Sequence, residues 1–164
     1  MAEAWLSGPV PGVDPWLLPA AHALVQTRAD LRRAAEGLTN EQLWARPKGV
    51  ASVAFHLLHV AGATARLLTY ARGDALDAAQ KAFLGREKTE AIDTDAATLL
   101  AELDAALDRA LSQIAATPRG SLLEARCVGR DRLPSTVLGL IFHAAEHAQR
   151  HAGQATTTSK LLRG

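Results

Sequence analysis

Three histidines spaced four residues apart constrain this chain more than any other feature of its sequence. His143, His147 and His151 lie in the segment I-F-H-A-A-E-H-A-Q-R-H-A-G-Q, which runs from residue 141 to residue 154. An α-helix turns by about 100° and rises by about 1.5 Å per residue, so these side chains form one slowly drifting stripe. The spacing therefore predicts a helix in which any adjacent pair of the stripe can bind one metal ion.

A second histidine pair, His56 and His59, lies much earlier in another helical pattern, F-H-L-L-H-V-A-G-A. One imidazole from that helix could join two from the late helix and complete a three-nitrogen site. Zinc, nickel and iron bind neutral imidazole, and three protein ligands leave a position open for water or substrate. A lone histidine on an apolar face is more often a hydrogen-bonded core or surface residue. Burying several imidazoles without partners is costly, however, so five histidines on two inward-facing stripes strengthen the case for a metal and leave both interpretations open.

Length and charge limit the classes of protein to consider. The chain has 164 residues, and its 18 Lys and Arg against 17 Asp and Glu give a net charge of +1. We expect a single domain over residues 1–164, with an irregular lead-in at 1–15 and a tail at 155–164. The balanced charge lacks the basic footprint of a nucleic-acid-binding protein, so no nucleic acid partner is expected.

The compartment is also constrained by composition. The one cysteine, Cys127, excludes an internal disulfide and suits a reducing cytoplasm. No stretch approaches the roughly 18 to 20 uninterrupted apolar residues of a membrane span, and the first residues lack a basic segment followed by an apolar one. We therefore expect a cytoplasmic protein that does not enter a membrane.

Four segments carry apolar residues at helical spacing, which predicts an all-α four-helix bundle. The first runs from Trp16 to Gly37, with Pro15 in its first turn, and the second from about Ala51 to Arg72. The last opens at Pro134 and frays near Gly153. The third ends before Pro118 and is defined by Leu99, Leu103, Leu107, Leu111 and Ile114.

The connections between these segments differ in character. Thr39 and Gln42 have the spacing of a capping box, which predicts a short helical turn ending near Pro47. Residues 74–94 are polar and weakly patterned, and we interpret them as a long connection with about one helical turn that shapes a site or an interface. Residues 119–133 contain four arginines and two acids, typical either of a solvated loop or of an anion-binding rim.

Other polar residues near the stripe have simpler interpretations. Glu146 lies about 100° off the histidine stripe and four residues before Arg150, so a helix-surface ion pair is expected rather than a general base. Gln154 follows the stripe and either orients a ligand or caps the helix end. Cys127 lies in a loop, and nothing in the sequence marks it as reactive.

At these residues the chain resembles the DinB family, also known as the DinB/YfiT-like metalloenzymes. The resemblance covers nearly the whole chain. The similar segments are S-V-A-F-H-L-L-H-V-A-G at 52–62, R-L-L-T-Y-A-R-G at 66–73, V-G-R-D-R-L-P-S-T-V-L-G-L-I-F-H-A-A-E-H-A-Q-R-H-A-G-Q at 128–154, and L-T-N-E-Q-L-W-A-R-P before the second helix.

The resemblance implies a four-helix bundle, often homodimeric, with a divalent metal held by three histidines. By position, the ligands are His59, His147 and His151. His56 and His143 are then neighbours that support the ligands or line a pocket, and His22 is unrelated to the site. Ala152 departs from the family pattern, which usually has arginine there, and this puts in doubt any role for a charge at that position.

The resemblance implies less about the reaction. Some relatives are thiol transferases or thiol-dependent isomerases, and many have no known activity. We therefore expect an enzyme that depends on zinc, nickel or iron, such as a thiol S-transferase or a hydrolase, acting on a small molecule with a low-molecular-weight thiol as a partner. The alternative is a non-catalytic metal-binding dimeric bundle with a stress-related or structural role.

Overall fold

The computed structural model describes residues 3–87, 89 and 93–163. It is mostly helical, as the composition and periodicity predicted, with one small antiparallel sheet. The elements are α1 (Leu18–Ala35), α2 (Asn40–Trp44), α3 (Val53–Arg72), α4 (Ala78–Arg86), α5 (Ala96–Ala116), β1 (Ala125–Val128), β2 (Leu133–Thr136) and α6 (Val137–Arg163), with short 3₁₀ turns at Ala4–Leu6, Pro47–Gly49 and Arg119–Ser121.

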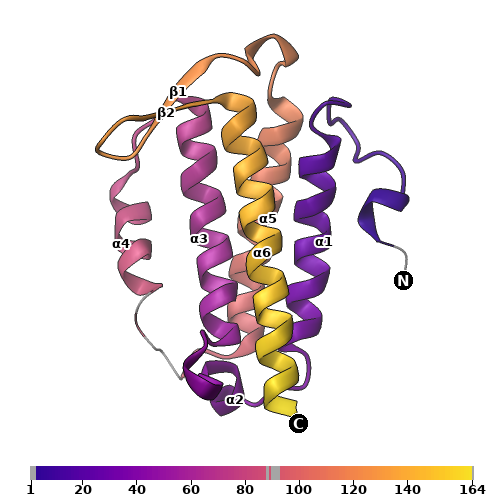
Figure 1. Cartoon of the computed structure of the whole chain (residues 1–164), viewed down its shortest axis with the longest axis vertical. Coiled ribbons are helices and arrows are strands. Elements are labelled where there is room, and N and C mark those ends of the chain that lie inside the picture. Colours follow the sequence, from indigo (N-terminus) through magenta and orange to yellow (C-terminus); the bar gives the residue numbers. More distant parts are fainter. Residues whose placement is uncertain (1–2, 88, 90–92, 164) are drawn as a thin grey trace.

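The four long helices lie side by side, as Figure 1 shows. α6 contacts α1 and α3, and α5 contacts the same two helices on their other side. α4 lies against the outer side of α3, and the β1–β2 hairpin lies at the end of the long helices where α6 begins (Figure 1). This arrangement leaves α3 and α6 directly adjacent, so side chains from both can share one site.

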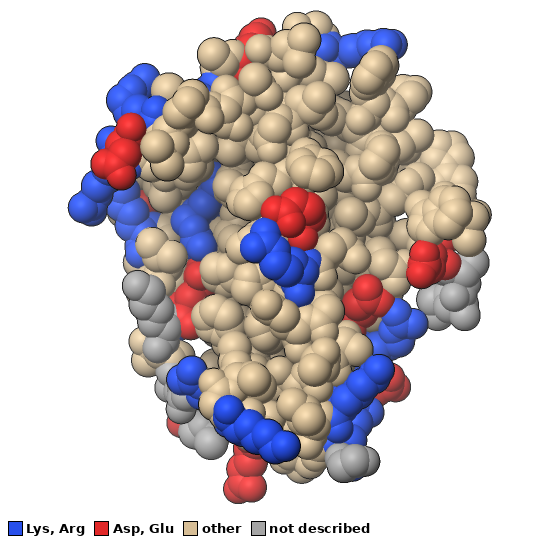
Figure 2. Space-filling view, viewed as in Figure 1, with Lys and Arg blue, Asp and Glu red and all other residues tan. Residues whose placement is uncertain are grey.

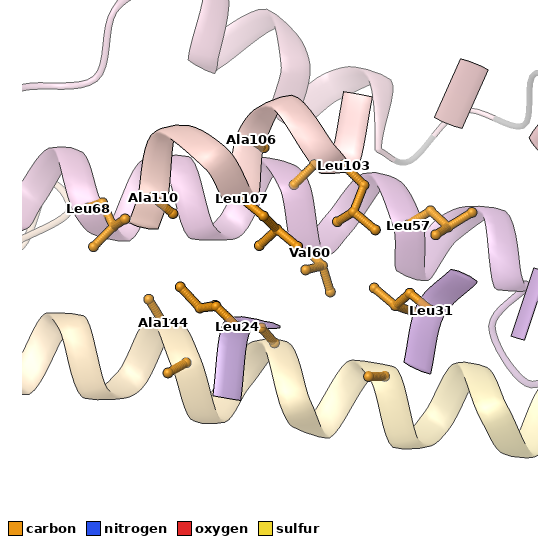
Figure 3. Close-up of a cluster of buried hydrophobic side chains, with 14 of the residues drawn as sticks. Leu24, Leu31, Leu57, Val60, Leu68, Leu103, Ala106, Leu107, Ala110 and Ala144 are labelled. Atoms are coloured by element: carbon orange, nitrogen blue, oxygen red, sulfur yellow. The ribbon is translucent and has the colours of Figure 1, made fainter. Parts of the chain in front are cut away.

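The core is built from the leucine-rich faces of these helices. Figure 3 shows Leu107 of α5 among Leu24 of α1, Val60 of α3 and Ala144 of α6. Full burial of such a side chain contributes roughly 1.5–3 kcal/mol relative to leaving it exposed. The many alanines on α6 let this helix approach its neighbours closely. The core therefore fixes the relative positions of α3 and α6, on which the site depends.

The predicted bounds of the first three long helices are close to the observed ones. α1 begins at Leu18, with Pro19 rather than Pro15 in its first turn. α3 begins after Ser52, whose hydroxyl accepts a hydrogen bond from the Phe55 N–H, and ends at Gly73 in the left-handed conformation (φ 86°). The capping box of Thr39 and Gln42 at the start of α2 is confirmed.

The start of the last helix was predicted wrongly. Pro134 and Ser135 belong to β2, which pairs antiparallel with β1 and places Pro134 opposite Cys127. The helix begins only at Val137. A proline has no N–H to donate, which suits the first turn of a helix and an edge strand equally well, so this residue alone could not decide between the two.

The end of the last helix was also predicted wrongly, because α6 continues through Gly153 to Arg163 and takes in the predicted tail. Ala155, Thr158 and Ser159 are buried in this extension. The Thr158 hydroxyl donates to the Ala51 carbonyl (3.0 Å). A glycine within a helix costs about 1 kcal/mol relative to alanine, and burial along the extra turns offsets this.

The segment 74–94 contains more helix than predicted. α4 spans Ala78–Arg86, and a capping box formed by Asp77 and Gln80 starts it. None of its residues is buried, so it has no apolar stripe from which periodicity could be recognised. Residues 88 and 90–92 of the predicted connection lie outside the described part of the chain.

Charges of both signs are mixed on the surface shown in Figure 2, with a broad uncharged area among them. Within residues 3–87, 89 and 93–163, no single helix has both the length and the apolar composition of a membrane span. The pair Asn40–Gly49 and Val53–Arg72 meets the same criteria only when joined across a 94° bend.

Candidate metal centre

Three histidines from two helices converge where α3 meets α6. His59 projects from α3, and His147 and His151 project from α6, with one potential ligand nitrogen from each within 4.8 Å of the others. The Nε2 atoms of His59 and His147 are 3.0 Å apart. Two nitrogens bound tetrahedrally to one zinc ion, each about 2.0–2.1 Å from it, lie roughly 3.3 Å apart. The cluster therefore matches the dimensions of a metal site.

The rings meet edge to face and stay partly accessible. The ring centroid of His151 is 4.5 Å from that of His59 and 4.5 Å from that of His147. All three residues have intermediate exposure, and the His59 side chain is 21% exposed. An ion at their centre would thus be reachable from solvent, as a catalytic metal has to be.

The remaining ring nitrogen of His59 contacts a buried carboxylate. Nδ1 of His59 is 2.8 Å from Oε2 of Glu87, the residue that follows α4. Glu87 also accepts hydrogen bonds from the guanidinium of Arg66. Glu87 was not among the predicted site residues, because it lies in the segment interpreted as a connection. The capping box at Asp77 could have revealed α4, but no local signal marks Glu87 as a contact of His59.

His151, like His59, contacts a buried side chain through its Nδ1. Its Nδ1 is 3.0 Å from Nδ1 of His56, a residue that is only 2% exposed. One of these two nitrogens must carry the proton and the other must accept it. If His151 donates, its Nε2 stays free for an ion. His56 thus lies behind the three-histidine cluster and contacts one of its members.

His143 and His22 lie outside the cluster. The His143 ring is 5.5 Å from the His147 ring, and its Nδ1 is 2.7 Å from Glu146. Glu146 also accepts two hydrogen bonds from Arg150, at 2.8 and 3.0 Å, which confirms the predicted surface ion pair. His22 contacts the Gly8 carbonyl at 2.8 Å and connects the lead-in to α1.

The imidazoles of His56, His147 and His151 are held neutral. Burial, followed by the charge of His59, lowers the pKa of both His56 and His147 from 6.5 to about 4. Burial and the neighbouring histidines, His59 first, lower the pKa of His151 to about 3. Neutral imidazole is the form that binds metal, so near pH 7 these rings are ready to do so without losing protons.

The two nearby carboxylates stay ionised. Burial acts to raise the pKa of Glu87, but its hydrogen bonds with His59 and Arg66 outweigh this and hold the pKa below its usual value. Partial desolvation likewise opposes the contacts of Glu146 with Arg150 and His143, which hold its pKa low. Glu87 therefore presents a negative charge to the side of His59 that faces away from His147.

Two cavities lie beside the cluster. One of about 500 Å³ is bordered by His56 and by polar groups of α6, including Arg150, Gln154 and Thr157. A smaller one of about 190 Å³ is lined by Phe55 and Glu87, among others. Neither cavity is lined by any residue of the arginine-rich segment 119–133.

The arginine-rich segment instead forms the β1–β2 hairpin and the turn before it. There Arg126 donates to the Ala71 carbonyl at the end of α3 (2.8 Å) and to Glu124 (2.9 Å). Cys127 is exposed on β1 of the same hairpin. Residues 119–133 border neither cavity beside the histidine cluster, so their interpretation as an anion-binding rim is not supported there.

The fold and the cluster together define a helical protein with a three-histidine candidate metal centre. A family model for the DinB superfamily matches residues 23–155, which include all five histidines of α3 and α6. The chain therefore belongs to the DinB superfamily. A search of curated proteins found no match.

Proposed function

We propose that this protein is a divalent-metal-dependent enzyme whose ion is bound by His59, His147 and His151. The observation that carries the proposal is that the ligand nitrogens of these residues lie within 4.8 Å of one another. In the described part of the chain this group contains three histidines and no cysteine or carboxylate. Three nitrogen ligands leave part of the ion uncovered, which is typical of catalytic rather than structural sites.

Zinc, nickel and iron all suit this ligand set. When bound, such an ion lowers the pKa of a coordinated water or thiol, so that a hydroxide or thiolate forms near neutral pH. We therefore propose thiol S-transfer, with hydrolysis as the related possibility. The 500 Å³ cavity bordered by His56 and α6 is the proposed place for a small-molecule substrate.

The fold type and oligomeric state that we propose with this function are those that the resemblance to the superfamily implies. The four long helices α1, α3, α5 and α6 would constitute a DinB/YfiT-like four-helix bundle, and two copies would form a homodimer in the cytoplasm. The low-molecular-weight thiol would be the second substrate. Analytical ultracentrifugation tests the dimer, and a purely monomeric protein at working concentrations would contradict that part.

Elemental analysis of protein purified without a histidine tag tests the metal assignment. We expect about one divalent ion per chain in the wild type and its loss in His59→Ala. His22→Ala is the matched control because His22 contacts only the Gly8 carbonyl among its described partners, and it should keep the metal. A wild type without transition metal, or an unchanged content in His59→Ala, would end the proposal.

A screen of low-molecular-weight thiols against small electrophiles, with the metal-loaded protein, tests the reaction. We expect turnover that disappears in His147→Ala and persists in His22→Ala. Stoichiometric metal without turnover of any thiol or hydrolytic substrate would instead favour a non-catalytic metal-binding protein.

A further inference from the structure

We propose that Glu87 is the positioning residue of the metal centre: its carboxylate holds the proton of His59 on Nδ1 and so directs the Nε2 lone pair toward His147 and His151. The effect on metal binding rests on the proposed function above. The effect on the His59 proton does not, because it concerns the protein without metal.

The first support is the burial and complete pairing of the carboxylate. The Glu87 side chain is only 3% exposed, yet both of its oxygens have partners. Oε2 lies 2.8 Å from His59 Nδ1 and 3.2 Å from one guanidinium nitrogen of Arg66, and Oε1 accepts from the other nitrogen. A two-pronged arginine contact fixes a carboxylate in orientation as well as in charge. Glu87 is therefore aimed at His59 by Arg66, which is itself only 11% exposed.

The second support is the space left for this carboxylate on α3. His59, Gly62 and Arg66 are three and four residues apart, so they share one side of the helix. A Cβ added at Gly62 would collide with Oε1 of Glu87, and it would lie 2.7 Å from Cδ1 of Phe83 and 2.8 Å from a guanidinium nitrogen of Arg66. Any side chain at this position would displace the Glu87 carboxylate. Glycine here thus allows the end of α4 to approach His59.

The third support is that α4 is attached to the long helices independently of Glu87. The Gln80 amide donates to the Thr69 hydroxyl (2.8 Å) on α3. Arg86, one residue before Glu87, donates to both carboxylate oxygens of Glu102 on α5, at 2.7 and 2.9 Å. These contacts would keep α4 in place if the Glu87 carboxylate were removed. Removing the Glu87 carboxylate should therefore change the positioning of His59 without undocking α4.

The physical reason for the role lies in the two tautomers of neutral imidazole. A proton on Nδ1 leaves Nε2 free as a ligand, whereas a proton on Nε2 would block the nitrogen that faces His147. A carboxylate that accepts from Nδ1 favours the first form and also makes Nε2 a stronger donor to a metal. Loss of such a partner typically weakens metal affinity 10- to 100-fold.

Two variants and one control test the proposal by zinc affinity, measured in competition with a chelator. Glu87→Ala should weaken binding about 10- to 100-fold, and Glu87→Gln, which keeps an acceptor without the charge, should weaken it less. Glu102→Gln is the control, since it disturbs the contact of α4 with α5 but leaves His59 untouched, and its affinity should stay at the wild-type level. Equal affinity of folded Glu87→Ala and wild type would overturn the proposal, as would an equal loss in Glu102→Gln.

Nitrogen-15 NMR of the histidine rings in metal-free protein gives a readout that a purely structural role would not change. In the wild type the proton of neutral His59 should reside on Nδ1, and in Glu87→Ala it should shift toward Nε2. If Glu87→Ala does not fold, Glu87→Leu, which also removes the acceptor but fills more of the space, gives the same comparison. An unchanged His59 tautomer without the carboxylate refutes the proposal even if zinc binds normally. A clear tautomer shift between the wild type and Glu87→Ala, in a protein that binds no metal, would support this proposal while the proposed function fails.

Discussion

Helices α4 and α5 both pack on α3, and they do so by different means. α5 buries Leu99, Leu103 and Leu107 in the core, but it contributes none of the candidate metal ligands. α4 has no buried residue. It contacts α3 through the Gln80–Thr69 hydrogen bond and α5 through the Arg86–Glu102 pair, and its one apolar side chain packed against the core, Phe83, is only half-buried. It nevertheless leads directly into Glu87, which contacts His59.

The difference shows that stability and site geometry depend on separate parts of this fold. Apolar burial, which dominates folding, is concentrated where α5 faces the other long helices. The polar contacts of α4 contribute little net free energy each, because exposed ion pairs are worth about 0–1 kcal/mol. Their main effect is to place the Glu87 carboxylate at a defined position beside His59. The following expectations test this division of roles, beginning with the largest effect.

Leu107→Ala should destabilise the protein most. Leu107 is fully buried at the centre of the core, and such truncations cost about 2–5 kcal/mol. Chemical denaturation measures the loss. The matched control is Leu84→Ala on α4, where the side chain is 40% exposed and the expected change is within about 0.5 kcal/mol. Similar losses for the two variants would mean that α4 belongs to the core after all.

Acidification should lower the free energy of unfolding of the metal-free protein, because of its buried neutral histidines. In metal-free protein, His56 and His147 have a pKa of about 4 and His151 of about 3, against 6.5 as their ordinary value. As the pH falls below about 6.5 the unfolded chain binds protons that the folded chain does not, so stability decreases until these lower pKa values are passed. The unfolding equilibrium constant should rise by up to roughly tenfold per pH unit for each such histidine.

Denaturation of metal-free protein between pH 7 and pH 3 checks this. His151→Asn removes one of the depressed groups and should reduce the slope. A stability that stays flat from pH 6.5 to 4 would mean that these rings are not buried as neutral imidazoles.

Gly62→Ala should weaken zinc binding about tenfold by displacing the Glu87 carboxylate. The control is Gly85→Ala in α4, where an added Cβ meets no atom within 4 Å. That change should leave zinc affinity intact and stabilise α4 by about 0.5–1 kcal/mol, because alanine favours helix over glycine. If Gly62→Ala binds zinc as tightly as the wild type, the close approach of α4 to α3 has no bearing on the site.

Removal of the N-cap side chains of α4 and α5 should have the smallest effects. The two substitutions should destabilise different parts of the molecule. Asp77 caps α4 through Gln80, and Asp95 caps α5 through Thr98. Asp77→Ala should weaken α4 by about 1 kcal/mol, seen as faster hydrogen exchange in α4 alone. Asp95→Ala should instead lower the midpoint of global unfolding. Global destabilisation by Asp77→Ala would indicate that α4 unfolds together with the long helices.

Much of the fold could be predicted from sequence because the long helices have apolar stripes. The leucines from Leu99 to Leu107 face the core as their spacing required, and α5 ends before Pro118 as expected. The hairpin was missed because each strand has only four residues, too few to show alternation. The extension of α6 beyond Gly153 was missed because its buried Ala155 and Thr158 are weak hydrophobic signals.

For the site, periodicity indicated five candidate histidines, and only the family resemblance selected the three that the structure brings together, with His56 and His143 as neighbours. The structure distinguishes the two: His56 contacts His151, whereas His143 pairs with Glu146 at the surface. Whether the three ligands bind metal remains a prediction.

The sequence by itself determined which residues can act as ligands and on which helical faces they lie, because helix geometry repeats every few residues and leaves its period in the chain. Only the tertiary structure decided that Glu87 meets His59, because that contact depends on how α4 lies across α3. α4 is positioned by individual hydrogen bonds and by the space above Gly62, and neither of these leaves a periodic pattern in the sequence.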